Sequence, residues 1–538
     1  MKETKFIFVT GGVISGLGKG VSAASIGNLL KARDFKVFAM KLDPYLNVDP
    51  GVLSPFEHGE VYVTNDGGET DLDLGHYERF MDEELSKFSS ITSGKLLQRL
   101  INQEREGGFN GKTVQIVPHF TDKVQQAIMD IEAHHHPDFA IIEIGGTVGD
   151  LESNPFFYAL AQLKYKIPNR VFFIHTSYVP FLDASGDFKS KPTQHSIATL
   201  RQLGINPNMV LLRSHKECTN DVVQKVAKYS FLDEKTVIPV PDLPQVYQMP
   251  LYLEKFEVAQ SILSYFNLEA KQPNLAKWTE FVNLLTAKNL TNVKIGMVGK
   301  YVQFEDAYKS IIEALKNSAA YLQQKINLVW VDSEQINNLQ DAKNVIQGLD
   351  GVVILPGFGN RGVEGKILIA EATREMLVPT LGICLGMQVM SINQARRKGI
   401  TNATSYEFKT KGKDETYVLD LIRGKNESDN MGGTLRLGAS FTQIKPNTLA
   451  RKIYSKELVS ERHRHRYEIN PKYRDLIEDD EFIFSGEEPN SHLAEICELK
   501  NHPFYLGTQY HPEFNARPLK PSPLFTEFLK STENYSSK

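Results

Sequence analysis

Short apolar runs that alternate with helix-forming segments are the feature that most constrains the fold of this chain. In the first half they are residues 6–9, 37–42, 114–117, 139–144, 171–178, 209–212 and 237–240. A second series consists of residues 293–299, 328–331, 351–355, 378–383 and 504–510. Runs this short and this uniformly apolar are typical of parallel strands that are covered on both faces by helices. The sequence therefore predicts an α/β protein with two doubly wound domains and mainly parallel sheets.

Length and composition set the number of domains. A chain of 538 residues is too long for one ordinary core. Residues 268–292 are polar, form no apolar run, and separate the two series. We therefore expect a first domain over 1–267, a linker with a helical part over 268–292, and a second domain over 293–538.

Charge, hydropathy and cysteine content restrict the partners and the compartment. The net charge is −4, so no basic excess favours nucleic acid. No apolar run reaches the roughly 18 residues of a membrane span. The three cysteines are far apart and predict neither a disulfide framework nor a cysteine-rich metal site. We expect a cytoplasmic protein that binds neither nucleic acid nor membrane.

A glycine-rich loop, Gly11–Gly20, follows the first apolar run and precedes a helix expected over 21–32. Strand, loop and helix with Lys19 form a P-loop arrangement, in which backbone N–H groups and the lysine bind phosphates. The loop departs from the Walker A pattern at Val13, where the template has its first glycine. It departs again at Gly20, where the template has a hydroxyl that binds Mg²⁺. A glycine-rich turn with a surface lysine is the alternative, and the flanking elements favour the phosphate site.

Charged residues also follow other strands of the first domain. Lys41 lies at the end of the second strand, where parallel sheets bind anions. Glu143 ends another strand before a glycine-rich turn, as a Mg²⁺-binding carboxylate does. The loop over 54–77 carries the acidic residues Glu57, Glu60, Asp66, Glu69, Asp71 and Asp73. These are candidate Mg²⁺ ligands, although a solvated acidic loop is the interpretation for most of them. Lys189 and Lys191, just before a helix, predict a second anion site.

Cys384 lies between Gly382 and Gly386, after an apolar run and before a helix expected over 387–397. This spacing is the thiol form of the nucleophile elbow. By itself the elbow leaves two interpretations open, a reactive thiolate at a helix N-terminus and a buried structural cysteine.

His511 and Glu513 decide between these interpretations. They follow the apolar run over 504–510, two residues apart, as a Cys–His–Glu triad requires. The backbone N–H groups of Gly357 and Leu385 are candidates for the oxyanion hole. Cys218 and Cys497 have no such surroundings and are interpreted as structural.

Taken together, these motifs resemble known families. GICLGMQ at 382–388 with HPE at 511–513 resembles the class I glutamine amidotransferases. FVTGGVISGLGKG, MKLDPYLNVDPG, HGEVYVTNDGGETDLDLGHYERF, EIGGTVGDLE, KSKPTQHS and ERHRHRYEIN together resemble the CTP synthase family, over about residues 4–515. The resemblance implies a P-loop amidoligase domain that phosphorylates UTP with ATP. It also implies an amidotransferase domain that supplies ammonia from glutamine to make CTP.

The resemblance also implies binding residues. For ATP they are Ser15, Gly16, Leu17, Gly18, Lys19, Gly20, Lys41 and Asp73, with Mg²⁺ held by Asp73 and Glu143. For UTP and the inhibitor CTP they are Ser15, Asp150, Leu151, Glu152, Lys189, Ser190, Lys191, Pro192, Thr193, Gln194 and Lys225. For glutamine they are Gly357, Leu385, Gly386, Met387, Gln388, Glu407 and Arg466. One departure is that the family reads P-G-G-F-G where this chain reads Pro356-Gly357-Phe358-Gly359.

The resemblance further implies GTP as an allosteric activator and a homotetramer, with filaments in some members. Two other functions are weighed against it. One is a different P-loop amidoligase that acts on carboxylates, and the other is a nucleotide-sensing scaffold without chemistry. The KLDPY and RHRHRYE motifs argue against the first, and the retention of Lys19, Cys384 and His511 in one chain argues against the second.

Overall fold

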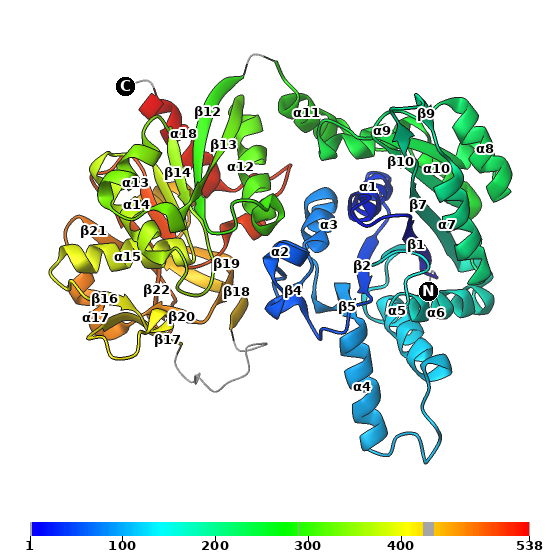
Figure 1. The fold of residues 1–538 in the computed structure, drawn as a ribbon, viewed down its shortest axis with the longest axis horizontal. Helices are drawn as coiled ribbons and strands as arrows, with labels where there is room; N and C mark the ends of the chain where they lie inside the picture. The colour runs from blue at the N-terminus through cyan, green and yellow to red at the C-terminus, as the bar shows by residue number, and fades with distance from the viewer. Residues whose placement is uncertain (1–2, 289, 423–434, 537–538) are drawn as a thin grey trace. The chain divides into compact units, whose positions relative to one another are not determined.

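The computed structural model describes residues 3–288, 290–422 and 435–536. The chain forms two compact units, residues 1–50 with 73–282 and residues 51–72 with 283–538. Figure 1 shows a β-sheet with surrounding helices in each unit. The prediction of two α/β domains with mainly parallel sheets is confirmed.

The first unit contains a seven-stranded sheet in the order β11-β10-β7-β1-β6-β2-β5, and all its pairs are parallel. Its strands are β1 (Lys5–Gly12), β2 (Val37–Asp43), β5 (Ser90–Thr92), β6 (Phe139–Ile144), β7 (Val171–Tyr178), β10 (Met209–Ser214) and β11 (Val237–Pro241). A separate hairpin pairs β8 (Phe181–Leu182) with β9 (Asp187–Phe188). Because the strands are parallel, the loops after β1, β2, β6 and β7 leave from the same edge of the sheet.

Helices pack on this sheet. They are α1 (Lys19–Lys31), α3 (Asp73–Met81), α4 (Ser93–Arg105), α5 (Thr121–His135), α6 (Asn154–Lys166), α7 (Lys191–Gln202), α8 (Asn220–Ser230), α9 (Met249–Lys255) and α10 (Val258–Tyr265). α11 (Ala276–Leu285) spans the boundary between the units. Phe6 and Phe8 of β1 are fully buried in one core with residues of α5 and α6, so β1 is central.

One predicted strand of this unit is wrong. Residues 114–117 form no strand and are mostly exposed, and a short irregular helix, Ile116–Phe120, begins there instead. The edge of the sheet is occupied by β5, whose three residues the apolar pattern did not single out. The run over 114–117 has only three apolar residues and one polar residue, and Pro118 follows it. So short a run carries too little periodicity to distinguish a strand from a loop.

The second unit contains a nine-stranded sheet in the order β13-β12-β14-β15-β23-β22-β21-β18-β19. Its strands are β12 (Thr291–Gly299), β13 (Gln324–Asp332), β14 (Gly351–Ile354), β15 (Thr380–Ile383), β18 (Arg436–Ile444), β19 (Leu458–His465), β21 (Phe482–Glu487), β22 (Ala494–Leu499) and β23 (Tyr505–Thr508). The strands from β13 to β23 are parallel, and those from β22 onward are antiparallel. The sequence did not anticipate the antiparallel half.

The second unit also contains a separate three-stranded sheet of β16 (Ala403–Ser405), β17 (Thr416–Leu421) and β20 (Tyr467–Ile469). The helices of this unit are α12 (Lys309–Tyr321), α13 (Leu339–Ile346), α14 (Val363–Glu375), α15 (Leu385–Arg397), α16 (Leu449–Tyr454), α17 (Pro471–Ile477) and α18 (Pro523–Ser536). Among the described residues, no helix is long and apolar enough to cross a membrane.

Residues 51–72 belong to the second unit, although they lie within the first predicted domain. They form α2 (Pro55–His58) and a hairpin of β3 (Tyr62–Val63) with β4 (Glu69–Thr70). The fully buried Arg462 on β19 donates hydrogen bonds to Asn65 Oδ1, the Tyr62 hydroxyl (3.0 Å) and Val63 O (2.9 Å). This long-range bonding, between residues some 400 apart in the chain, carries no local sequence signal.

Candidate active site

Cys384 sits on a sharp turn between β15 and α15. Its φ is 54° and its ψ is −103°, an uncommon conformation for a residue with a side chain. Its backbone N–H donates to Thr508 O of β23 (2.7 Å), which fixes the turn against the neighbouring strand. A Cβ atom on Gly386 would lie 2.3 Å from Ile354 O, so only glycine allows α15 to approach the sheet this closely. The predicted elbow is therefore present.

His511 and Glu513 follow β23, which pairs directly with β15. His511 Nδ1 lies 2.7 Å from Glu513 Oε1, and both side chains are buried. Burial by itself lowers the pKa of His511, but the charges of Glu513 and of a Cys384 thiolate outweigh it and raise the pKa to about 10. His511 Nε2 has no hydrogen-bond partner among the described residues, so it is available to the sulfur and to a leaving group. The His511–Glu513 pair beside Cys384 is the arrangement that a Cys–His–Glu triad needs.

Two further groups contact the sulfur. Gln509 Nε2 lies 3.7 Å from Cys384 Sγ, and the thiol faces Arg464 O at 3.8 Å. Gln509 is itself held through Oε1 by the side chain of Gln388 (3.1 Å). Sequence reasoning missed Gln509 and Arg464, and their only available signal was proximity in the chain to HPE and to RHRHRYE.

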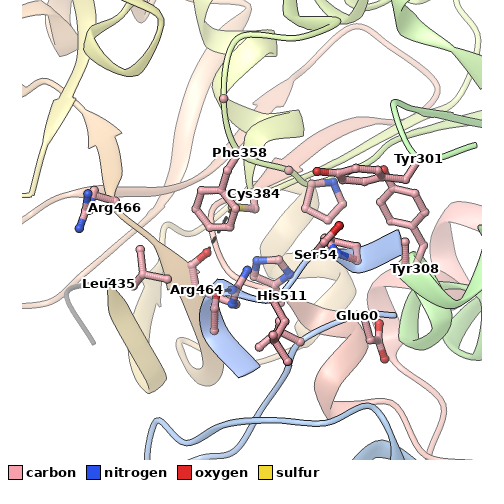
Figure 2. Close-up of a pocket in the computed structure, with 18 of the residues that line it drawn as sticks. Ser54, Glu60, Tyr301, Tyr308, Phe358, Cys384, Leu435, Arg464, Arg466 and His511 are labelled. Atoms are coloured by element: carbon pink, nitrogen blue, oxygen red, sulfur yellow. Dashed lines mark hydrogen bonds between the residues drawn. The ribbon is translucent and has the colours of Figure 1, made fainter. Parts of the chain in front are cut away.

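A cavity of about 680 Å³ opens beside the sulfur. In Figure 2, Cys384, His511 and Phe358 lie close together, with Arg466 and Leu435 to one side and Tyr301 and Tyr308 to the other. Three of the residues predicted to hold glutamine line the cavity: Gly357, Glu407 and Arg466. Leu385, Gly386, Met387 and Gln388 are buried in the first turn of α15 and are not among the lining residues. Gln388 instead donates to Tyr467 O (3.0 Å) and to Gln509.

The shortened glycine loop after β14 is fixed by three side chains. Glu407 Oε1 accepts from the N–H of Gly359 (2.6 Å), and Lys300 Nζ donates to Phe358 O. Lys366, buried on α14, donates to Leu355 O (2.6 Å), and burial lowers its pKa to about 7. Lys300 and Lys366 were not predicted. Their bonds show how the loop is held with one glycine fewer than the family pattern.

In the first unit, Lys19 starts α1 directly after the glycine-rich loop. Its Nζ donates to Gly146 O (2.5 Å), and burial lowers its pKa. A Cβ atom on Gly20 would lie 2.2 Å from Asp73 Oδ1. The missing Walker A hydroxyl therefore has a structural reason, because the carboxylate of Asp73 occupies that space.

Lys41, Asp73 and Glu143 meet beside Lys19. Lys41 Nζ lies 2.5 Å from Asp73 Oδ2 and 3.5 Å from Asp43 Oδ1. Glu143 pairs in register with Lys41 and accepts a hydrogen bond from the Tyr77 hydroxyl. Burial and the charge of Asp73 raise the pKa of Glu143 to about 8, even though Lys41 and Lys19 oppose this shift.

These two carboxylates suit Mg²⁺. They are held close enough to repel each other, and a divalent cation would relieve this repulsion. No cluster of three or more metal-binding side chains occurs among the described residues. A pair of carboxylates is nevertheless enough to hold Mg²⁺ when waters and phosphate oxygens complete its shell. Other acidic residues of the loop over 54–77 have protein partners, such as Glu69 with Arg464 (3.0 Å) and Glu60 with the N–H of Ser310 (2.8 Å).

The residues predicted for the pyrimidine nucleotide follow β1, β6 and β7, which are neighbours in the sheet. Asp150, Leu151 and Glu152 are exposed, as are Ser15 and Lys225. Lys189 precedes α7, and Lys191 is its first residue. Thr193 and Gln194 are buried in the first turn of this helix. The structure therefore brings these loops to one edge, and Lys225 comes from α8 next to α7.

Both parts of the chain match families of known proteins. Residues 5–268 match the family model "CTP synthase N-terminus", and residues 303–531 match "Glutamine amidotransferase class-I". A CTP synthase of Mycoplasmopsis pulmonis is 60% identical over 98% of both chains. One of Nostoc punctiforme is 45% identical over 98% of this chain and 96% of its own. The glutaminase domain of Trypanosoma brucei CTPS with bound acivicin is 33% identical, with a TM-score of 0.42 over 45% of this chain and 94% of that domain.

Proposed function

The chain belongs to the CTP synthase family, and from that premise we propose that the residues described above carry its reaction. It is a glutamine-hydrolysing ligase that converts UTP to CTP at the expense of ATP. One observation supports the assignment of residues best. The Cys384 turn with the His511–Glu513 pair and the Lys19–Lys41–Asp73–Glu143 cluster occur in the same chain.

Ammonia is made at Cys384. The thiolate attacks the side-chain amide carbon of glutamine, and an S–C bond forms while the carbonyl oxygen becomes an oxyanion. The N–H groups of Gly357 and Leu385 stabilise that oxyanion. The imidazolium of His511 then gives its proton to the departing ammonia, and a thioester remains. His511 next accepts a proton from the water that hydrolyses the thioester, with Glu513 fixing the ring orientation throughout.

Ammonia is used in the first unit. Lys19 binds the ATP phosphates, and Lys41 stabilises the phosphoryl group that passes to the uracil 4-oxygen. Ammonia then adds at that carbon, and phosphate leaves with the C–O bond electrons. Asp73 and Glu143 hold Mg²⁺, which when bound neutralises charge on the phosphates. The loops after β1, β6 and β7, together with Lys225, bind UTP and the inhibitor CTP.

Further features are proposed from the family resemblance. They are activation by GTP, a homotetramer of the kind that forms filaments in some members of the family, and a cytoplasmic location. No nucleic acid and no membrane is a partner in this proposal.

The experiment that tests the residue assignment follows CTP from UTP and ATP, with either glutamine or free ammonia as nitrogen donor. Cys384→Ala abolishes the glutamine reaction and leaves the ammonia reaction. Lys19→Ala abolishes both, yet leaves glutamine hydrolysis. Cys497→Ala, which removes a buried cysteine that is not a member of the triad, is the matched control and should keep both reactions.

Each outcome has a separate meaning. Glutamine use by Cys384→Ala would refute the triad. Absence of CTP from ammonia with the unmodified protein would refute the pyrimidine assignment and favour a carboxylate amidoligase. Absence of ATP hydrolysis as well as CTP would leave a scaffold without chemistry.

A further inference from the structure

His175 is a buried histidine of β7 that the reaction described above does not use. It lies in register with Thr10 of β1, just before the glycine-rich loop. His175 Nδ1 is 2.9 Å from Thr10 Oγ1, and His175 Nε2 is 2.9 Å from Ser196 Oγ on α7. Thr10 and His175 are fully buried, and Ser196 is 7% exposed. One side chain therefore joins the strand that carries the phosphate loop to the helix that begins at Lys191.

Each ring nitrogen of His175 has a hydroxyl partner, so either neutral tautomer forms a bond at both ends. When the Thr10 hydroxyl donates to Ile174 O (3.2 Å), His175 Nδ1–H donates to Thr10 Oγ1 and Nε2 accepts from the Ser196 hydroxyl. In the other tautomer Thr10 donates to Nδ1, and Nε2–H donates to Ser196 Oγ. The chain of bonds runs from Ser196 through the ring to Thr10 and ends on a backbone carbonyl. Both ring nitrogens are therefore paired inside the fold.

The surroundings keep the ring neutral. Burial, together with the charge of Lys19, lowers the pKa of His175 to about 3. The backbone of the loop at Gly12 also packs closely against the bond between His175 and Ser196. A Cβ atom on Gly12 would lie 1.6 Å from Ser196 Oγ and 2.9 Å from His175 Nε2. A shift of α7 would therefore be transmitted both to Thr10 and to the first glycines of the loop.

We propose that His175 is a positioning residue that holds the phosphate loop and α7 in register, so that ATP and the uracil 4-oxygen meet in line. The inference rests on the proposed function, in which the loop binds ATP and the start of α7 binds UTP. Phosphoryl transfer between two bound substrates depends steeply on their alignment, and a displacement of about 1 Å costs on the order of a hundredfold in rate. Loss of the bridge should thus lower kcat more than it raises either KM.

A second bond between the same strand and helix provides the control. Ser177 Oγ on β7 donates to Thr193 Oγ1 of α7 (3.0 Å), and Thr193 donates to Tyr178 O (2.9 Å). This bond also anchors α7 to β7, but neither of its hydroxyls hydrogen-bonds to a described side chain of β1. Ser177→Ala therefore weakens the anchoring of the helix without interrupting the path to Thr10.

The test is a double-mutant cycle of Thr10→Val and Ser196→Ala, measured as kcat of CTP synthesis from ammonia. The two residues contact opposite nitrogens of His175, so coupling between them reports the bridge. We expect each single variant to lower kcat about tenfold and the double variant to fall no further than about twofold below them. The cycle of Thr10→Val with Ser177→Ala should be multiplicative. Both KM values should change less than kcat, and glutamine hydrolysis should not change.

His175→Gln provides an independent variant, because its amide oxygen can accept from Ser196 but its side chain does not also reach Thr10. We expect it to stay folded, as checked by its thermal midpoint, and to match the low kcat of Thr10→Val. If His175→Gln instead keeps the kcat of the unmodified protein, His175 only fills space and the proposal is overturned. A multiplicative Thr10–Ser196 cycle would overturn it too. If the unmodified protein makes no CTP from ammonia, the proposed function itself fails, which is a different result from an active enzyme with a multiplicative cycle.

Discussion

Two buried side chains carry protonation states at neutral pH that are the reverse of their usual ones. His511 is charged, because Glu513 and the thiolate outweigh the effect of burial. Glu143 is neutral in the absence of a metal ion, because burial and Asp73 outweigh two lysines. Both states follow from neighbours that are distant in the sequence. Each makes a prediction about pH.

Glu513→Gln should slow the alkylation of Cys384 by iodoacetamide at pH 7 by about tenfold. Without the carboxylate, the pKa of His511 falls from its raised value, the imidazolium is lost at lower pH, and the thiolate loses its partner. Because the folded pKa is raised, the pair stabilises the fold fully below about pH 6.5 and loses this contribution as the pH rises towards 10. Reaction rates with iodoacetamide from pH 5 to 10 measure the effect.

Glu527→Gln removes a carboxylate from an exposed ion pair with Lys530 and serves as the control. Its alkylation profile should coincide with that of the unmodified protein. An unchanged profile for Glu513→Gln would contradict the assigned role of Glu513.

The affinity for Mg²⁺ in the absence of nucleotide should rise about tenfold between pH 7 and pH 9. The raised pKa of Glu143 means that the metal competes with a proton at neutral pH and not at pH 9. The same shift makes the metal-free fold lose stability as the pH rises from about 4.5 to 8, because the folded state holds the proton more tightly. Titration calorimetry in buffers of different ionisation enthalpy would measure both the affinity and the released proton.

Glu143→Gln should bind Mg²⁺ weakly and without this pH dependence. A pH-independent affinity of the unmodified protein would place the metal elsewhere.

At the scale of the element, residues 51–72 are the part of the chain that the domain prediction did not anticipate. Gly51, Ser54 and Glu60 line the cavity beside Cys384, so this segment forms part of the wall of the glutaminase site. Gly51 O accepts from Arg464 (2.9 Å), and Glu69 forms an ion pair with the same guanidinium. The segment is therefore held by the RHRHRYE strand, a motif that the sequence linked to function without indicating its partner.

Arg462→Met should release this segment and destabilise the second unit by on the order of 3 kcal/mol. Three acceptors would lose a charged donor that is fully buried, and the methionine cannot replace it. Proteolysis within residues 51–72 should become faster, and the KM for glutamine should rise because one wall of the cavity is lost.

Arg397→Met, which breaks an exposed ion pair with Glu371 at the end of α15, is the matched control. Equal protease resistance of the two variants would argue against the anchoring role of Arg462.

At the scale of the whole molecule, the chain combines a site that makes ammonia with a site that activates a pyrimidine. Under the proposed regulation, GTP should raise the rate of CTP formation from glutamine and leave the rate from ammonia unchanged. The reason is that only the first reaction uses Cys384. Initial rates with each donor, over a range of GTP concentrations, would measure this, and equal stimulation of both would contradict it.

The sequence by itself determined six of the seven strands of the first sheet, the parallel strands of the second, the glycine-rich loop and the cysteine elbow. Each of these is local: an apolar run, a glycine spacing, a lysine at a helix start. It also paired Cys384 with His511 and Glu513, since loops after adjacent parallel strands meet at one edge. Only the tertiary structure decided which acidic residue reaches Lys41, since Asp73 and Glu69 lie four residues apart in one loop and enter different units. It likewise decided the antiparallel strands and the bonds of His175 and Arg462. Those contacts depend on distant parts of the chain meeting in a buried interior, where each polar group must find a partner.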